Sequence, residues 1–204
     1  MSIIKSLFTG SEGSYKVLGI PVDFHKELPP NTLLLSSENL ALNYALKCLK
    51  NRVFCLATLG YVHLLVHEMG HALIGKFFLN QNTRVGIYTK DCVSATISSS
   101  SSAPSWKKTI RYAAGPIANM VFSSGKLVSA ALLRSYLPFP LSPILATGAL
   151  YWMTCEMCHA AISAKEKKGD FGKIALNGKV HLGLASSALM AQCALGIFAA
   201  MKLG

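Results

Sequence analysis

Long runs of apolar residues set the pattern of the chain after its first quarter. Each run is close to the roughly 20 residues that a helix needs to cross a bilayer. Small residues are frequent in the last three runs, which suits close helix packing in lipid. The pattern predicts an all-α membrane protein with about four transmembrane helices, at residues 53–79, 110–133, 141–164 and 180–201.

The first 52 residues are mixed in character, and glycines and the Pro29-Pro30 pair interrupt them. They predict an N-terminal extramembrane segment, residues 1–52, ahead of a membrane-embedded domain, residues 53–204. Within this segment, residues 15–24 favour one strand and residues 38–50 favour a helix. Residues 84–97 alternate in places between apolar and polar, which predicts a short β-hairpin or an irregular membrane-edge loop after the first apolar helix.

Composition agrees with a lipid environment. Hydrophobic residues make up 51% of the chain and charged residues only 14%, well below the roughly 25% typical of soluble domains. A chain this apolar is not expected to be disordered. The net charge of +11 comes from Lys and Arg that lie mainly between the apolar runs, as in membrane proteins. We therefore expect the lipid bilayer as a partner and no nucleic acid.

Candidate chemistry lies within the first apolar run. His67, Glu68 and His71 form an HExxH pattern, which on a helix brings both imidazoles to one face and within reach of one metal ion. Zinc is the expected ion, because it lowers the pKa of water toward neutrality, and Glu68 is the expected general base. Ionisable groups in an apolar helix are functional candidates by default.

A third metal ligand has to come from elsewhere in the chain. Ile74 and Phe77 stand where one soluble class of zinc proteases has glycine and histidine. The spacing alone leaves a short set of candidates downstream of Glu68: the carboxylates of Asp91, Glu156, Glu166 and Asp170, and the imidazoles of His159 and His181.

Three motifs together resemble the site-2 protease (M50) family of intramembrane zinc metalloproteases. They are the HExxH pattern, the segment Ala113-Ala114-Gly115-Pro116-Ile117-Ala118-Asn119, and Gly169-Asp170-Phe171-Gly172. The likeness covers about residues 53–174. It implies a three-helix catalytic core, proteolysis of a membrane-protein substrate in or near its transmembrane segment, and Asp170 as the third zinc ligand. The family's Asn-x-x-Pro run before the aspartate is missing, since Ile162 and Lys165 stand at those spacings.

Topology independently favours Asp170. If each apolar run crosses the membrane once, the HExxH pattern, the Gly115-Pro116 pair and Asp170 all lie at the same membrane face. By the positive-inside tendency that face is cytoplasmic. The short loop at the opposite face, residues 135–140, has no Lys or Arg. The two loops at the face of the three motifs are rich in basic residues: Arg84, Lys90, Lys107, Lys108, Lys165, Lys167, Lys168, Lys173 and Lys179.

The Gly115-Pro116 pair interrupts the second apolar run and frees backbone hydrogen-bonding groups. One interpretation is a kink that makes room for substrate, with Asn119 donating to the substrate backbone or to the oxyanion. The other is a packing kink that Asn119 caps. Glu156 and His159 share a helix face, and they are expected either to support a zinc-bound imidazole or to form interhelical hydrogen bonds.

The sequence thus predicts a multi-pass intramembrane zinc metalloprotease of the cytoplasmic membrane. His67, His71 and Asp170 bind Zn²⁺, and Glu68 is the catalytic base. One alternative is another HExxH membrane metalloprotease with Glu156 or Glu166 as third ligand. The other is a membrane scaffold that retains the fold without catalysis.

Overall fold

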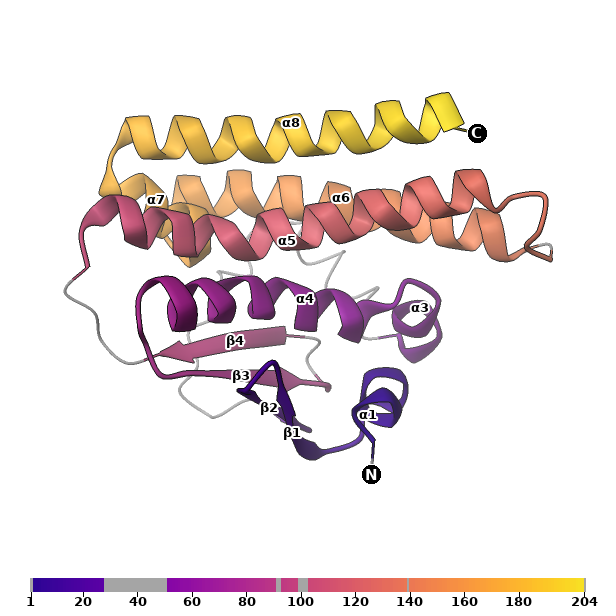
Figure 1. The fold of residues 1–204 in the computed structure, drawn as a ribbon, viewed down its shortest axis with the longest axis horizontal. Coiled ribbons are helices and arrows are strands. Elements are labelled where there is room, and N and C mark those ends of the chain that lie inside the picture. The colour runs from indigo at the N-terminus through magenta and orange to yellow at the C-terminus, as the bar shows by residue number, and fades with distance from the viewer. Residues whose placement is uncertain (1, 28–50, 91–92, 99–102, 139, 204) are drawn as a thin grey trace.

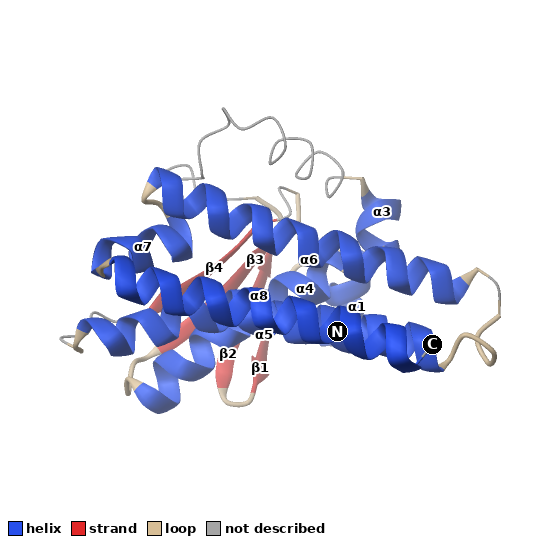
Figure 2. Ribbon diagram, turned by 90° about the horizontal axis from the view of Figure 1, so that it is seen from above, coloured by secondary structure: helices blue, strands red, loops and turns tan. Residues whose placement is uncertain are grey.

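The structure is a computed structural model that describes residues 2–27, 51–90, 93–98, 103–138 and 140–203. Its elements stack in layers, with a small sheet below helix α4 and the longer helices above (Figure 1). Viewed from the α8 side, the strands lie beneath the helices (Figure 2). The elements in chain order are α1 (Ile3–Thr9), β1 (Gly13–Val17), β2 (Ile20–His25), α3 (Arg52–Ala57), α4 (Gly60–Leu73), η1 (Ile74–Phe78), β3 (Thr83–Tyr88), β4 (Val93–Ser98), α5 (Ser105–Leu132), α6 (Leu141–Glu166), α7 (Gly169–Asn177) and α8 (Lys179–Leu203).

Among the described residues, the sheet has four strands in the order β1-β2-β3-β4. Strands β1 and β2 form an antiparallel hairpin, as do β3 and β4. The two hairpins join through parallel pairing of β2 with β3, in which Val22 lies opposite Val85 and Phe24 opposite Ile87. The N-terminal segment therefore shares one sheet with the chain that follows the HExxH helix.

Two apolar clusters hold the layers together. The first joins the sheet to α4, where Val22, Val85 and Ile87 pack with Leu65 and Met69. The second joins the long helices and is built from residues of α5, α6, α7 and α8 that include Met120, Met153, Phe171, Ile174 and Leu189. Helix α5 contacts α4, α6, α7 and α8. It thus connects α4 to the outer helices, and Trp152 of α6 also packs in the first cluster.

The prediction of an all-α protein with about four transmembrane helices is wrong. The sheet is one reason. The apolar residues of the first predicted span cover that sheet, and a turn at Leu59, whose φ is 58°, divides the span between α3 and α4. The second and third predicted spans form long helices, α5 and α6, but neither is apolar enough to count as a candidate membrane span among the described helices. Within the predicted spans, Arg111 and Lys126 of α5 and Glu156 of α6 are charged.

Among the described helices, α8 is the one long and apolar enough to cross a membrane by length and composition. Its 25 residues cover the fourth predicted span, and only 17% of its most apolar window is buried. Large apolar side chains on it are exposed, among them Val180, Leu184, Leu195, Phe198 and Met201. The multi-pass topology predicted from the sequence is therefore corrected to a single candidate span at the C-terminal end.

The short β-hairpin predicted at residues 84–97 is confirmed as β3 and β4. The single strand predicted at residues 15–24 is instead most of a two-stranded hairpin, β1 and β2, that turns at residues 18–19. The helix predicted at residues 38–50 lies outside the described residues. The domain division at residue 52 stays a prediction.

Candidate metal centre

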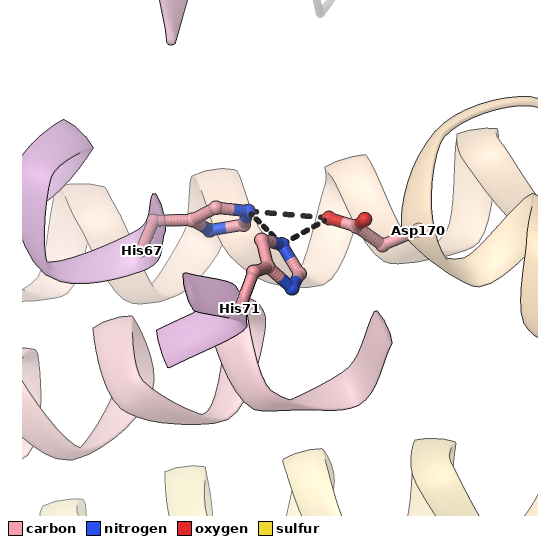
Figure 3. Close-up of side chains that lie close together, drawn as sticks. All are labelled: His67, His71 and Asp170. Atoms are coloured by element: carbon pink, nitrogen blue, oxygen red, sulfur yellow. Dashed lines mark hydrogen bonds and ion pairs between the residues drawn. The ribbon is translucent and has the colours of Figure 1, made fainter. Parts of the chain in front are cut away.

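Three side chains predicted as metal ligands come together at one point. His67 and His71 project from consecutive turns of α4, and Asp170 reaches them from the first turn of α7 (Figure 3). Asp170 Oδ2 lies 3.2 Å from His67 Nε2 and 3.1 Å from His71 Nε2, and the two Nε2 atoms are 3.2 Å apart. Within the described residues, this is the group of His, Cys, Asp and Glu side chains that can hold a metal ion.

The spacing of these three atoms suits tetrahedral zinc. Ligand atoms placed about 2.0–2.1 Å from a tetrahedral centre are about 3.3 Å apart, and the three measured separations lie within 0.2 Å of that value. Two imidazoles and one carboxylate are also a donor set that zinc accepts. Three protein ligands leave a fourth position for water or substrate, as in catalytic rather than structural zinc sites.

Both imidazoles have their Nδ1 atoms engaged, so that Nε2 faces the other ligands. His67 Nδ1 lies 3.0 Å from Glu156 Oε1. His71 Nδ1 lies 2.7 Å from the backbone carbonyl of Arg111. Each acceptor requires a proton on Nδ1, which leaves the Nε2 lone pair for a metal ion. Carboxylate and carbonyl partners of this kind orient zinc-binding histidines in general.

A tight turn between α6 and α7 places Asp170. Lys167 adopts a left-handed conformation with φ 56°, and Gly169 follows with φ 63°, a region that glycine enters without steric cost. Helix α7 then packs closely on the end of α6, because a Cβ on Gly172 would lie 2.6 Å from the Ser163 carbonyl oxygen. The turn therefore directs Asp170 back toward α4.

Gly115 lets α5 approach the metal ligands. A Cβ at this position would lie 2.2 Å from His71 Nε2 and 2.5 Å from Cε1. Pro116 follows inside the helix, is buried, and has no N–H to give to the preceding turn. Gly115 thus makes room for the His71 imidazole. The Arg111 carbonyl, one turn earlier in α5, accepts from Nδ1 of the same ring.

Gly115→Ala is expected to weaken zinc binding, because the added methyl displaces the His71 ring at its metal-binding nitrogen. Overpacking of this kind costs about 1–3 kcal/mol, which is roughly 5- to 150-fold in zinc affinity. Titration with zinc against a competing chelator measures the change. Gly125→Ala is the matched control on the same helix, since a Cβ there meets nothing within 4 Å. Equal zinc affinity in the two variants would contradict the predicted role of Gly115.

Contacts with neighbouring charged groups together affect the pKa values of the three ligands more than burial does. Burial alone would raise the pKa of Asp170, but His71 and His67 hold it well below its usual range. Burial alone would lower the pKa of His67, but Glu156 and Asp170 raise it well above 6.5. The pKa of His71 is also raised, by Asp170 against the effect of burial. Asp170 is therefore ionised, as a metal ligand must be.

Glu68 is held by hydroxyls from the edge strand β4. Ser94 Oγ donates to Oε1 at 2.9 Å, and Thr96 Oγ1 lies 2.6 Å from Oε2. An ionised carboxylate has about four acceptor sites, so these two bonds fix its direction and leave lone pairs for a proton. Neither hydroxyl is predicted from the sequence. Their spacing, two residues apart on one face of a strand, was the available signal.

The other residues singled out in the sequence lie outside the three ligands. Asn119 is 1% exposed, and its amide contacts Glu156 and His63. Its predicted role in substrate binding stays a prediction, as do those of Gly115 and Pro116. Glu156 touches His67 at Nδ1 rather than at the metal-facing nitrogen. Asp91 lies outside the described residues, and the candidate group does not include Glu166, His159 or His181.

Comparison with known proteins assigns this chain to no family. No protein-family model, no curated protein and no solved structure matches the chain.

Proposed function

We propose that this chain is a zinc-dependent peptidase that hydrolyses peptide bonds in or next to a membrane-spanning segment of a protein substrate. The observation that supports it most is the triangle of His67 Nε2, His71 Nε2 and Asp170 Oδ2, with 3.1–3.2 Å sides. Glu68 follows directly after the first of these ligands on the same helix. A bare metal-storage site would not need that carboxylate.

Zinc bound here would polarise a substrate carbonyl and make water acidic enough to lose its proton near neutral pH. The residues of the chain do the remaining work. The Glu68 carboxylate takes a proton from the attacking water and gives it to the departing amine. Ser94 and Thr96 hold that carboxylate in one direction during both transfers. Asp170, His67 and His71 fix the position of the zinc.

An extended polypeptide suits the surroundings of Glu68. Strand β4 lies at one end of the strand order, and among the described residues no strand pairs with its outer side. An exposed strand edge can bind a peptide as a further strand of the sheet. The hydrogen bonds are between backbones, so they do not depend on the side chains of the peptide. A peptide paired with β4 would lie next to the residues that hold Glu68. This placement favours peptide hydrolysis over hydrolysis of a small ester or phosphate.

The resemblance to site-2 proteases belongs to this proposal. The Ala-Ala-Gly-Pro segment adjoins His71 through Gly115, and the Arg111 carbonyl just before it accepts from His71 Nδ1. Asp170 adjoins both histidines. Each motif on which the resemblance rests therefore contributes to one site, although the motifs are far apart in sequence.

Helix α8 supports a membrane location. We propose that it anchors the chain in the cytoplasmic membrane, with the metal centre toward the cytoplasm. Helix α8 begins at the end of the helical layer where α5 begins and α6 ends, because Asn177 donates to the Ser105 carbonyl at 3.3 Å. This end also carries α7 with Asp170, and lysines gather there, as on cytoplasmic faces: Lys107, Lys108, Lys165, Lys167, Lys168, Lys173 and Lys179.

The experiment uses the full chain, purified in detergent and reconstituted into lipid vesicles with single-span membrane proteins tagged at both ends. We expect about one zinc ion per chain, and zinc-dependent cleavage in or near the span of a substrate. A chelator should stop cleavage, and added zinc should restore it. Mass spectrometry of the products locates the cut.

His67→Ala/His71→Ala is the inactive reference, and His181→Ala on α8 is the matched control that should keep zinc and activity. A wild-type chain without affinity for zinc would overturn the proposal. So would cleavage that the double variant retains in full, because the metal centre would then play no part in it.

A further inference from the structure

We propose that a buried chain of four side chains, Lys126, His63, Asn119 and Glu156, positions His67 for metal binding. These four would act as positioning residues, since none is among the ligand atoms of the metal centre. The inference rests on the proposed metal-dependent function and assigns to that site the residues that set its geometry. It gives Asn119 a role different from substrate binding.

The contacts form an unbroken path. Glu156 Oε1 lies 3.0 Å from His67 Nδ1 and 2.5 Å from Asn119 Nδ2. Asn119 Oδ1 lies 2.5 Å from His63 Nδ1. His63 Nε2 lies 3.1 Å from Lys126 Nζ. The path joins α4, α5 and α6, and it ends at the imidazole whose other nitrogen faces Asp170.

The donors and acceptors along this path have one consistent direction. A carboxylate only accepts, so Glu156 takes the Asn119 N–H and the His67 Nδ1–H. Asn119 then presents its carbonyl oxygen to His63, which must carry its proton on Nδ1. His63 Nε2 is left as an acceptor for the Lys126 amine. Each assignment forces the next, and together they require a proton on His67 Nδ1, so that Nε2 is the nitrogen that can bind a metal ion.

The protonation of His63 agrees with that direction. Burial and the neighbouring Lys126 amine lower the pKa of His63 to about 3, so the ring is neutral at physiological pH. A neutral imidazole is the form that donates at one nitrogen and accepts at the other. Burial also lowers the pKa of Lys126, to about 8.

Packing holds the path in place. The exposed fractions are 0% for His63, 1% for Asn119, 5% for Glu156 and 8% for Lys126. The His63 ring stacks on Trp152, with centroids 4.5 Å apart and planes 9° apart. Lys126 also donates to the Thr58 carbonyl at 3.0 Å. In so buried a setting, a broken hydrogen bond leaves polar groups without a partner, which is costly in free energy. Alternative orientations of His67 are therefore disfavoured.

The test measures zinc affinity by competition with a chelator on the full chain in detergent. Glu156→Gln keeps the side-chain volume but removes the negative charge that faces His67 Nδ1. Asn119→Leu removes both amide bonds. Each is expected to weaken zinc binding about 10- to 100-fold, as loss of a ligand's partner does elsewhere. Ser123→Ala is the matched control and should change nothing, because Ser123 is buried on the same helix with no hydrogen-bond partner for its Oγ among the described residues.

Two further readouts separate positioning from general stability. In the double variant, the Asn119 substitution should add little to the loss from Glu156→Gln, because Asn119 acts through Glu156. Cobalt bound in place of zinc should show an altered visible spectrum in both single variants, while melting temperatures of the metal-free proteins show that they fold. Additive losses, or an unchanged spectrum and affinity, would overturn the positioning role. If the positioning role fails in this way while the wild-type chain still binds zinc, the proposed function stands. Failure of the further inference is therefore distinguishable from failure of the proposed function.

Discussion

Replacing Glu68 with glutamine is expected to slow peptide hydrolysis by roughly 10²- to 10⁴-fold, the contribution of a general base, without removing zinc. Glutamine keeps the shape of the side chain but cannot take a proton from water. Its amide can still meet Ser94 and Thr96, because each hydroxyl rotates to donate or to accept. The fold at β4 is therefore preserved. Initial rates of cleavage and the zinc content per chain are measured on the same preparation.

Glu68→Asp is the informative control for this prediction. Aspartate keeps the basic group and shortens its reach by one methylene, so we expect a rate between those of wild type and Glu68→Gln. Zinc should again be retained, since Glu68 is not one of the three ligand residues. A Glu68→Gln variant as fast as wild type would show that no proton passes through this carboxylate.

The candidate ligands could be predicted because their signals are local or topological. The i, i+4 spacing of His67 and His71 fixes their shared face on any helix. Asp170 is 99 residues from His71, and its convergence with the histidines followed from successive long helices running in opposite directions. This convergence does not depend on the four-span topology. It requires antiparallel helices, and lipid around them is not needed.

The sheet could not be predicted in the same way, because its central pairing is non-local. Strand β2 at residues 20–25 pairs in parallel with β3 at residues 83–88. The sequence of neither strand identifies the other as its pairing partner. Apolar residues of the HExxH helix, such as Leu65 and Met69, cover this sheet. A helix buried against a sheet and a helix in lipid both require apolar side chains, so hydropathy counted over a long run did not separate them.

The contacts around the ligands were the hardest to foresee. Ser94 and Thr96 are ordinary strand residues, and only the pairing of β4 with β3 turns their hydroxyls toward Glu68. Lys126 is joined to the Glu156 carboxylate by a hydrogen-bonded path through His63 and Asn119. Three helices have to be placed before such a path exists.

Replacing Asp170 with alanine is expected to remove zinc and activity together. The carboxylate supplies one of three ligand atoms and the only negative charge among them. Its loss should therefore cost more zinc affinity than the roughly 10- to 100-fold that loss of an outer partner costs. His67 and His71 would keep their Nδ1 partners, so the two imidazoles stay oriented but bind the metal weakly.

Chelator competition on the full chain measures the zinc affinity, and cleavage of the tagged membrane substrate measures activity. Glu166→Gln is the matched control, because Glu166 is a carboxylate at the nearby end of α6 and lies outside the ligand group. It should retain both zinc and activity. Full zinc retention in Asp170→Ala, with loss in Glu166→Gln, would assign the third ligand to Glu166. Retention in both variants would exclude both carboxylates and leave the two histidines without the partner that the 3.1 and 3.2 Å contacts indicate.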